Sequence, residues 1–253
     1  MDVGPTPAAI EIEDVHKILG GRVVLAGLSL RVPPRERLGI LGRSGSGKTV
    51  LLKHVVGLLR PDRGKIRVEG IDVGSGDPTA LRAARAKVGY LFQSAALLNS
   101  LTVFDNIALP LREGGGRGEA QIRAEVLEGL RLVGLEQDAH KFPAELSGGM
   151  KKRAGLARAL VGRRRIFLLD EPTTGLDPAG ATEIRDLIRD VHDRLEATTV
   201  FVTHDMNLAV RLSNRMAILA AGRIHALGTP AELARSDDPL VRGFLAGVSA
   251  PAA

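Results

Sequence analysis

Short apolar runs alternate with amphipathic stretches along most of this chain. Continuous apolar runs, such as RLGIL at 37–41 and TTVFVT at 198–203, predict strands that are covered on both faces. The runs after residue 32 each follow a helical stretch, which predicts right-handed crossovers and a parallel sheet. The predicted strands are AIEIEDV, LSLRV, RLGIL, KIRVEG, KVGYLF, RIFLLD, TTVFVT, RMAILA and RIHALG.

The start and the middle of the chain depart from this alternation. Residues 9–32 predict an antiparallel hairpin around Gly20-Gly21. Between Ser94 and Val161 strand signals stop and helical ones follow one another, which predicts a helical insertion carried by the α/β core. We expect one composite domain over 9–248, a helical subdomain over about 94–161, and flexible tails at 1–8 and 249–253. The predicted helices of the insertion are VFDNIALPLR, EAQIRAEVLEGLRLV and GGMKKRAGLARALV.

Composition narrows the class of protein. The chain has 253 residues, 44% of them hydrophobic and 25% charged, as in ordinary globular proteins. It has no cysteine, which excludes disulfides and thiolate metal sites and fits a reducing cytoplasm. The start, MDVGPTPAAI, lacks the layout of a secretion signal, and no apolar run reaches the roughly 18 residues of a spanning helix. We therefore expect a chain that does not cross a membrane by itself.

The net charge of +6 leaves three partners open: nucleic acid, an acidic lipid surface, or a nucleotide. One tyrosine and no tryptophan supply little material for stacking single-stranded bases. The basic clusters GRRRIF and MKKR are interpreted as solvated helix ends. Charge alone does not choose between these partners.

The stretch GRSGSGKT at 42–49 lies between a predicted strand and a predicted helix. Its glycines let successive N–H groups point inward, toward the positive end of the helix dipole. This G-x-x-x-x-G-K-T spacing is the phosphate-binding loop, in which Lys48 reaches the β- and γ-phosphates and the Thr49 hydroxyl coordinates Mg²⁺. A glycine-rich turn without a ligand is the alternative. The predicted nucleotide-binding residues are Gly42, Arg43, Ser44, Gly45, Ser46, Gly47, Lys48 and Thr49.

Hydrolysis needs carboxylates, and RIFLLDEP supplies two at the end of a buried strand. Open α/β sheets bind ligands at the carboxyl ends of their strands. We expect Asp170 to hold Mg²⁺ through water, and Glu171, on the other side of the pleat, to polarise the attacking water. The alternative is that Asp170 caps the next helix and Glu171 is simply exposed.

Two further strands end in polar residues. His204 follows TTVFVT and is predicted to contact the γ-phosphate and to sense its loss. Gln93 ends VGYLF where the helical insertion begins, and its carbonyl can bind Mg²⁺ and report nucleotide state to the helices. The alternatives are a packed or surface histidine and a polar strand terminus.

A second anion-binding helix terminus is predicted at ELSGGM. Ser147 is a good N-cap, and Gly148 and Gly149 leave backbone N–H groups bare at the start of a long helix. One nucleotide has one set of phosphates, so a second phosphate site suggests that two chains pair head to tail, each covering the ATP of the other. An ordinary capped helix is the alternative.

Taken together, GRSGSGKT, LFQ, LSGGM, LLDEP, GLD and VTHD occur in an order that resembles the ATP-binding subunit of an ATP-binding cassette (ABC) transporter, over roughly residues 9–248. The resemblance implies an α/β P-loop NTPase with a RecA-like parallel sheet, an antiparallel β subdomain and an inserted α-helical subdomain. It implies an ATPase that uses ATP and Mg²⁺, pairs with a second copy and drives membrane permease subunits. Ser147, Gly148 and Gly149 are then the signature contacting the partner's nucleotide, Gln93 the Q-loop glutamine, and Asp177 the D-loop residue at the dimer seam.

Within that family, the segment YLFQSAALLNSLTVFDNIALPLRE, Met150 in the signature and the tail SDDPLVRGFLAGV resemble the ATPase of Mla-type phospholipid transporters. This resemblance implies lipid transport with a permease and an MCE lipid-binding protein, at the cytoplasmic face of the inner membrane. The apolar residues just past Gln93 would receive a permease helix. Members commonly stack adenine on an aromatic ring where this chain has Leu19, so its base selectivity is expected to be loose.

Three other functions are weighed against this one. A nucleic-acid or ribosome-associated ATPase of the same superfamily suits the basic charge, but such proteins carry tandem cassettes or a coiled-coil insertion. A nucleotide switch without turnover is opposed by Glu171 and His204. An importer ATPase for a polar solute remains open. We expect no direct contact with nucleic acid.

Overall fold

The computed structural model describes residues 8–162 and 164–246. The chain divides into two compact units, which we call the terminal unit, residues 1–85 and 198–253, and the central unit, residues 86–197. The predicted flexible tails, 1–8 and 249–253, lie outside the described residues apart from Ala8, which is buried.

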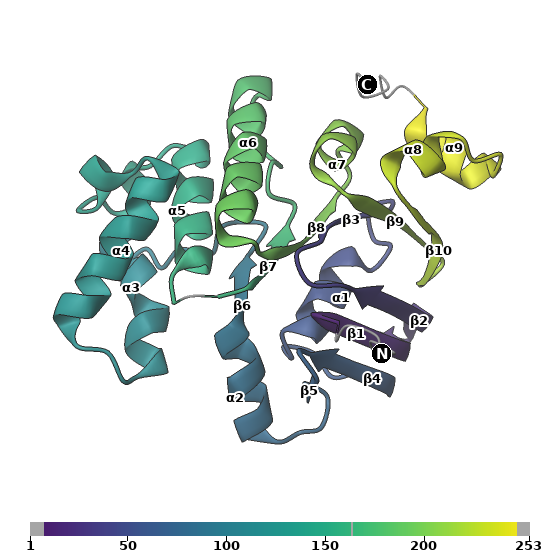
Figure 1. Ribbon diagram of the computed structural model, residues 1–253, viewed down its shortest axis with the longest axis horizontal. Coiled ribbons are helices and arrows are strands. Elements are labelled where there is room, and N and C mark those ends of the chain that lie inside the picture. The colour runs from purple at the N-terminus through teal and green to yellow at the C-terminus, as the bar shows by residue number, and fades with distance from the viewer. Residues whose placement is uncertain (1–7, 163, 247–253) are drawn as a thin grey trace, which may run out of the picture. The chain divides into compact units, whose positions relative to one another are not determined.

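An antiparallel sheet in the order β2-β1-β4-β5 forms the first part of the terminal unit (Figure 1). The predicted hairpin is confirmed, because β1 pairs antiparallel with β2 along its whole length. The prediction of parallel pairing is wrong for KIRVEG: this strand, β4, pairs antiparallel with β1 and brings Ile66 opposite Ile12. The strands are β1 Ile10–Leu19, β2 Arg22–Val32, β4 Arg63–Val68 and β5 Ile71–Asp72.

The rest of the terminal unit is built around β3 (Arg37–Leu41), which pairs in parallel with β8 (Thr198–Thr203) and β9 (Arg215–Ala220). Leu38, Ile40 and Leu41 are buried, as their continuous apolar run predicts. A second correction falls on RIHALG: this strand, β10, follows β9 through a tight turn and pairs antiparallel with it. The other elements are β10 Arg223–Gly228 and the helices α1 Lys48–Val55, α2 Pro78–Lys87, α7 Met206–Leu212, α8 Pro230–Ala234 and α9 Pro239–Leu245.

In the central unit, the helices α3, α4 and α5 pack against one another, and α5 also packs on β6 (Figure 1). β6 pairs in parallel with β7, with Leu91 opposite Leu169. Gly89 makes the close approach of α5 possible, because a Cβ at this position would collide with the carbonyl oxygen of Ala159. The elements are β6 Val88–Leu91, α3 Val103–Gly114, α4 Glu119–Val133, η1 Glu136–Asp138, η2 Pro143–Glu145, α5 Gly148–Leu160, β7 Ile166–Asp170 and α6 Pro178–Leu195.

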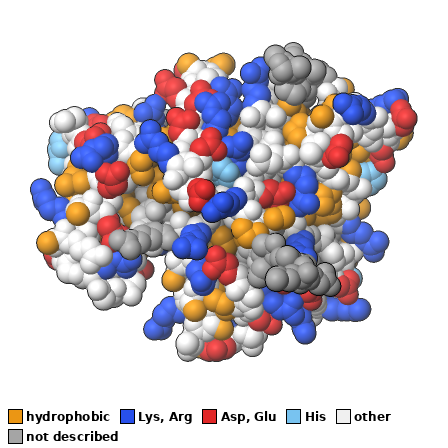
Figure 2. All heavy atoms as spheres, in the orientation of Figure 1, with side chains coloured by type: hydrophobic (Ala, Val, Ile, Leu, Met, Phe, Trp, Pro, Cys, Tyr) orange, Lys and Arg blue, Asp and Glu red, His pale blue; other side chains and the backbone are white. Residues whose placement is uncertain are grey.

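Charged side chains of both signs are mixed on the face of the molecule that Figure 2 draws. On the face drawn in Figure 2, Lys and Arg side chains are scattered among Asp and Glu side chains and do not gather into one patch. None of the helices within residues 8–162 and 164–246 has the length and apolar character of a membrane span.

Candidate nucleotide-binding site

The loop between β3 and α1 is held by close contacts that require glycine. A Cβ on Gly42 would lie 2.5 Å from Ser46 Oγ and 2.8 Å from the carbonyl oxygen of Leu219. Gly47 adopts φ 101° as the N-cap of α1, and a Cβ there would lie 3.0 Å from Val24 Cγ1. Close contacts therefore require glycine at position 42, and a left-handed backbone together with a close contact requires glycine at position 47.

The charges of this loop favour an anion. α1 has no acidic residue in its first turn, so its N-terminal dipole faces the loop uncompensated. The side chain of Lys48 is 7% exposed, and its ammonium group donates to the carbonyl oxygens of Gly42 at 2.9 Å and Arg43 at 3.4 Å. The buried hydroxyl of Ser46 has no hydrogen-bond partner within the part of the chain that the structure describes. This donor set fits a phosphate chain.

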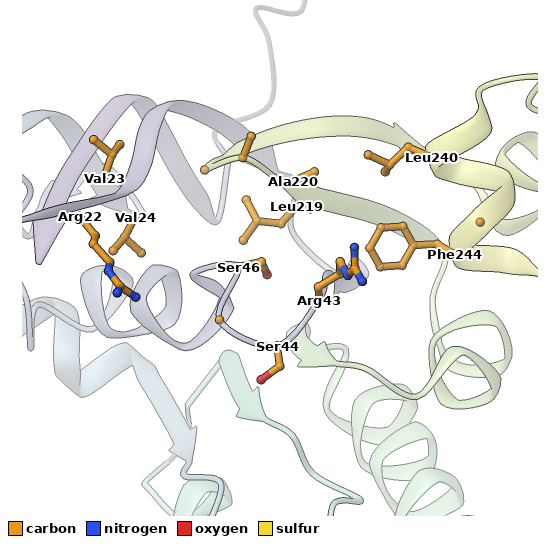
Figure 3. Close-up of a pocket in the computed structure, with 14 residues that line it drawn as sticks. Arg22, Val23, Val24, Arg43, Ser44, Ser46, Leu219, Ala220, Leu240 and Phe244 are labelled. Carbon is orange, nitrogen blue, oxygen red and sulfur yellow. The ribbon is translucent and has the colours of Figure 1, made fainter.

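A cavity of about 790 Å³ opens beside the loop. Figure 3 shows Arg43, Ser44 and Ser46 on one side of it, with Phe244 of α9 directed toward Arg43. The cavity has the size of a small-molecule site. It is lined by Arg22–Val24 of β2, Arg43–Ser46 of the loop, Leu219–Gly222 of β9 and its turn, and Leu240, Gly243 and Phe244 of α9.

Leu19, the position expected to face the base, ends β1 and is 38% exposed. The residues that line the cavity from this hairpin come three to five positions later, at Arg22, Val23 and Val24. Arg22, Val23 and Val24 offer one guanidinium and two branched aliphatic side chains as contacts for a base. The base selectivity that we predict from Leu19 stays a prediction.

In the central unit, Asp170 is the last residue of β7 and is only 3% exposed. Its carboxylate accepts a hydrogen bond from the Tyr90 hydroxyl of the neighbouring strand at 3.3 Å. Burial and the nearby Asp170 carboxylate raise the pKa of Tyr90 well above its usual value, so the phenol keeps its proton and remains a donor. A buried carboxylate oriented by the Tyr90 hydroxyl has the chemistry to accept hydrogen bonds from metal-bound water.

Glu171 does not continue the pleat, contrary to the expectation from strand alternation. Its backbone is left-handed, with φ 49°, and its side chain is 8% exposed. One carboxylate oxygen accepts from the Thr174 hydroxyl at 3.1 Å. Because a non-glycine residue in this region is strained by about 1–3 kcal/mol, the surrounding contacts must hold Glu171 in place.

Gln93 follows β6, and its side chain is exposed. The backbone carbonyl of Gln93 accepts a hydrogen bond from Lys152 of α5, whose ammonium group also donates to the carbonyl of Glu171 at 3.0 Å. The interpretation of MKKR as solvated is therefore wrong for Lys152, which is 5% exposed. Sequence reasoning missed this residue because three adjacent basic residues give no signal that one of them is buried.

The predicted N-cap of α5 is confirmed, because the Ser147 hydroxyl accepts from the Met150 N–H at 3.3 Å. Ser147 and Gly148 are exposed at the start of this 13-residue helix. Asp177 is likewise exposed, and its carboxylate caps α6 by accepting from the Gly180 N–H at 2.9 Å. The structure thus gives Asp177 a local helix-capping role.

His204 directly follows β8, and its side chain is exposed. Thr203 pairs with Leu41 of β3, so His204 and the start of the phosphate loop leave the sheet at neighbouring positions of the terminal unit. The next residue, Asp205, caps α7 by accepting from Leu208 N–H at 3.1 Å. The structure therefore brings His204 together with residues 42–49. It brings Gln93, Asp170 and Glu171 together in the central unit.

Comparisons with known proteins give consistent matches. A family model described as ABC transporter matches residues 25–174. The probable ribonucleotide transport ATP-binding protein mkl of Mycobacterium leprae is 43% identical over 243 residues, which cover 96% of this chain and 70% of the relative. The methionine import ATP-binding protein MetN of Cereibacter sphaeroides is 42% identical, and the match covers 98% of this chain and 72% of the relative.

Solved structures agree in fold. A dimeric post-hydrolysis structure of the ATP-binding cassette MJ0796, bound to ADP and Pi, matches with a TM-score of 0.80 and 31% identity, over 87% of this chain and 98% of that one. The structure of cbiO1 from Clostridium perfringens, part of the ABC transporter complex cbiONQ, matches with a TM-score of 0.81 and 27% identity, over 96% of each chain.

Proposed function

This chain belongs to the ABC transporter family and is an ATPase that uses ATP with Mg²⁺, and on this premise we propose that it powers the transport of phospholipid or another lipid-like substrate. The phosphate loop supports ATP binding by its donor set, and the strand end at Asp170 and Glu171 supports hydrolysis. The lipid assignment rests on the resemblance to Mla-type ATPases that is carried by the segment after Gln93, by Met150 and by the tail SDDPLVRGFLAGV.

The loop residues and the polar residues at the strand ends have different proposed roles. Residues 42–49 hold the phosphate chain, with the Lys48 ammonium group on the β- and γ-phosphates. Thr49, Gln93 and Asp170 would each offer an oxygen toward Mg²⁺, which would neutralise charge on the phosphate oxygens when bound. Glu171 orients and polarises the attacking water, and His204 contacts the γ-phosphate.

The exposed start of α5 supports pairing with a second copy. Ser147, Gly148 and Gly149 present bare N–H groups at a helix N-terminus, which favours an anion. In the pair, these residues cover the ATP held by the partner, and Asp177 lies at the dimer seam. Loss of the γ-phosphate then loosens the pair and moves the helices of the central unit.

The segment after Gln93 supports a permease contact. Asn106 fixes this segment from within α3, because its amide nitrogen donates to the carbonyls of Leu98, Leu101 and Thr102 at 2.9–3.1 Å. The Leu98 side chain remains 47% exposed. A fixed loop with an exposed apolar side chain suits a short permease helix. The complex would lie at the cytoplasmic face of the inner membrane and include permease subunits and an MCE lipid-binding protein.

A second candidate function is the import of a polar solute. It is favoured by the names of the relatives, which mention ribonucleotide transport and methionine import. Direct binding of nucleic acid has less support, because on the face of Figure 2 the basic side chains are interspersed with acidic ones.

The two candidates differ in what stimulates hydrolysis. The chain is assembled with its permease in vesicles, and ATPase activity is measured with phospholipid carried by the MCE protein, with methionine and with ribonucleotides. The proposal expects stimulation by phospholipid alone. Stimulation by methionine or ribonucleotide would replace the lipid assignment and leave the ATPase assignment intact.

A further inference from the structure

Lys152 connects two segments of the central unit that are far apart in the sequence. Its ammonium group donates to the backbone carbonyl of Gln93, 59 residues away, and to that of Glu171, 19 residues away. Burial lowers the pKa of Lys152, and the carboxylates of Asp170 and Glu171 oppose that shift. A buried cation with two carbonyl partners and two nearby carboxylates is well held in one position.

The segment after Gln93 is attached to α5 at a second point. The two terminal nitrogens of Arg158 donate to the carbonyls of Ala95 and Ala96, both at 2.7 Å. Ala95 and Ala96 are left-handed, with φ 61° and 48°. Alanine adopts this conformation only where other contacts compensate its strain, and these two bonds provide such contacts.

Close packing between α5 and this segment adds a third constraint. A Cβ on Gly155 would lie 2.9 Å from the Cβ of Ala95 and 2.9 Å from Leu91 Cδ1. Lys152, Gly155 and Arg158 follow one another at intervals of three residues, so they share one face of α5. This face of α5 contacts residues 93–96, and Lys152 also donates a hydrogen bond to the carbonyl of Glu171.

We infer that Lys152 is a positioning residue that couples the segment after Gln93 to the base Glu171. The inference rests on the proposed function, in which Glu171 activates water and the segment meets the permease. Glu171 has a strained backbone, and Lys152 fixes its carbonyl, so a displacement of Gln93 reaches Glu171 through one ammonium group. The coupling acts in both directions, because a binding or conformational linkage is reciprocal.

The first test is kinetic. Lys152→Met removes the charge and both hydrogen bonds, and we expect kcat for ATP to fall at least about 10-fold, because the loss of one hydrogen bond from a charged group already corresponds to about 10- to 100-fold. KM for ATP should stay unchanged, because the two hydrogen bonds that Lys152→Met removes go to backbone carbonyls of the central unit, at Gln93 and Glu171. The matched control is Lys151→Met, which removes the same charge from the neighbouring, half-buried position of α5.

The second test follows the segment itself. The chain has no tryptophan, so Leu98→Trp introduces a single fluorescent reporter at an exposed position. We expect Mg²⁺ and ATP to change its emission in the otherwise unchanged chain and with Lys151→Met, but not with Lys152→Met.

The outcomes separate this inference from the proposed function. A chain that neither binds nor hydrolyses ATP contradicts the proposed function. A wild-type kcat and a preserved emission change in Lys152→Met contradict the coupling while leaving the ATPase assignment intact. If the Met variant does not fold, Lys152→Gln, which removes the charge and shortens the reach, decides in its place: wild-type kcat in that variant overturns the inference.

Discussion

The phosphate loop and the carboxylate-bearing end of β7 are built in different ways. The loop is shaped by its own backbone, with Gly42 and Gly47 admitting close contacts and Lys48 bonded to carbonyls five and six residues away. The strand end at Asp170 and Glu171 is shaped by side chains from elsewhere, among them Tyr90 and Lys152. A site shaped by residues that are close in the sequence can be predicted from their spacing. A site shaped by side chains from distant parts of the sequence can be described only once the fold is known.

The largest expected effect is a loss of ATP hydrolysis without a loss of ATP binding. Glu171→Gln removes the proposed base and leaves the phosphate loop unchanged, so kcat for ATP should fall about 10²- to 10⁴-fold while ATP still binds. Steady-state turnover and equilibrium binding of a fluorescent ATP analogue measure the two quantities. Undiminished hydrolysis would remove Glu171 from the role of base.

The converse change acts on the loop. Lys48→Ala removes the buried ammonium group that we propose binds the phosphates, and we expect ATP affinity to weaken about tenfold to a hundredfold, as for the loss of a charged hydrogen bond. Lys53→Ala, which removes the same charge from the same helix, should bind ATP like the unchanged chain. Calorimetric titration of both variants decides, and wild-type affinity in Lys48→Ala would count against the loop.

Features that depend on neighbouring residues were predicted from the sequence, whereas features that depend on distant residues were not. Strands β3, β8 and β9 end where their apolar runs end, and the cap at Ser147 follows from its side chain alone. The pairing directions of β4 and β10 were not predictable in this way, because pairing depends on partners rather than on periodicity. The burial of Lys152 and the left-handed Glu171 are tertiary features for the same reason.

Within the loop, two glycines should differ in stability cost. Gly45 and Gly47 both have positive φ, 77° and 101°, but a Cβ meets nothing within 4 Å at Gly45 and meets Val24 at Gly47. Gly45→Ala should lower the free energy of unfolding by about 1–2 kcal/mol from backbone strain alone. Gly47→Ala should cost about 1–3 kcal/mol more, because overpacking is added. Urea denaturation compares them, and equal costs would contradict the crowding at Val24.

The smallest effect concerns a surface feature of the helical region. The Thr102 hydroxyl and Arg112 lower the pKa of Asp105 below its usual 3.8, so the charged carboxylate is favoured in the folded state. Its contribution to stability is complete above pH 3.8 and is lost as pH falls through the lower folded-state pKa. The effect is small because the pair is partly exposed.

Asp105→Asn should therefore remove a small part of the acid dependence of the urea midpoint. The comparison is made between neutral pH and pH values below 3.8. An acid dependence identical to that of the unchanged chain would show that Asp105 has the same pKa in the folded and unfolded states.

The proposed mechanism requires that each ATP is held by the phosphate loop of one copy and covered by Ser147, Gly148 and Gly149 of another. Sedimentation of the Glu171→Gln chain, with and without Mg²⁺ and ATP, tests this claim most directly. We predict that the 26.8 kDa chain sediments as a single copy without nucleotide, and with Mg²⁺ and ATP as a pair that carries two unhydrolysed ATP molecules. A chain that binds ATP tightly and still sediments as a single copy would contradict it.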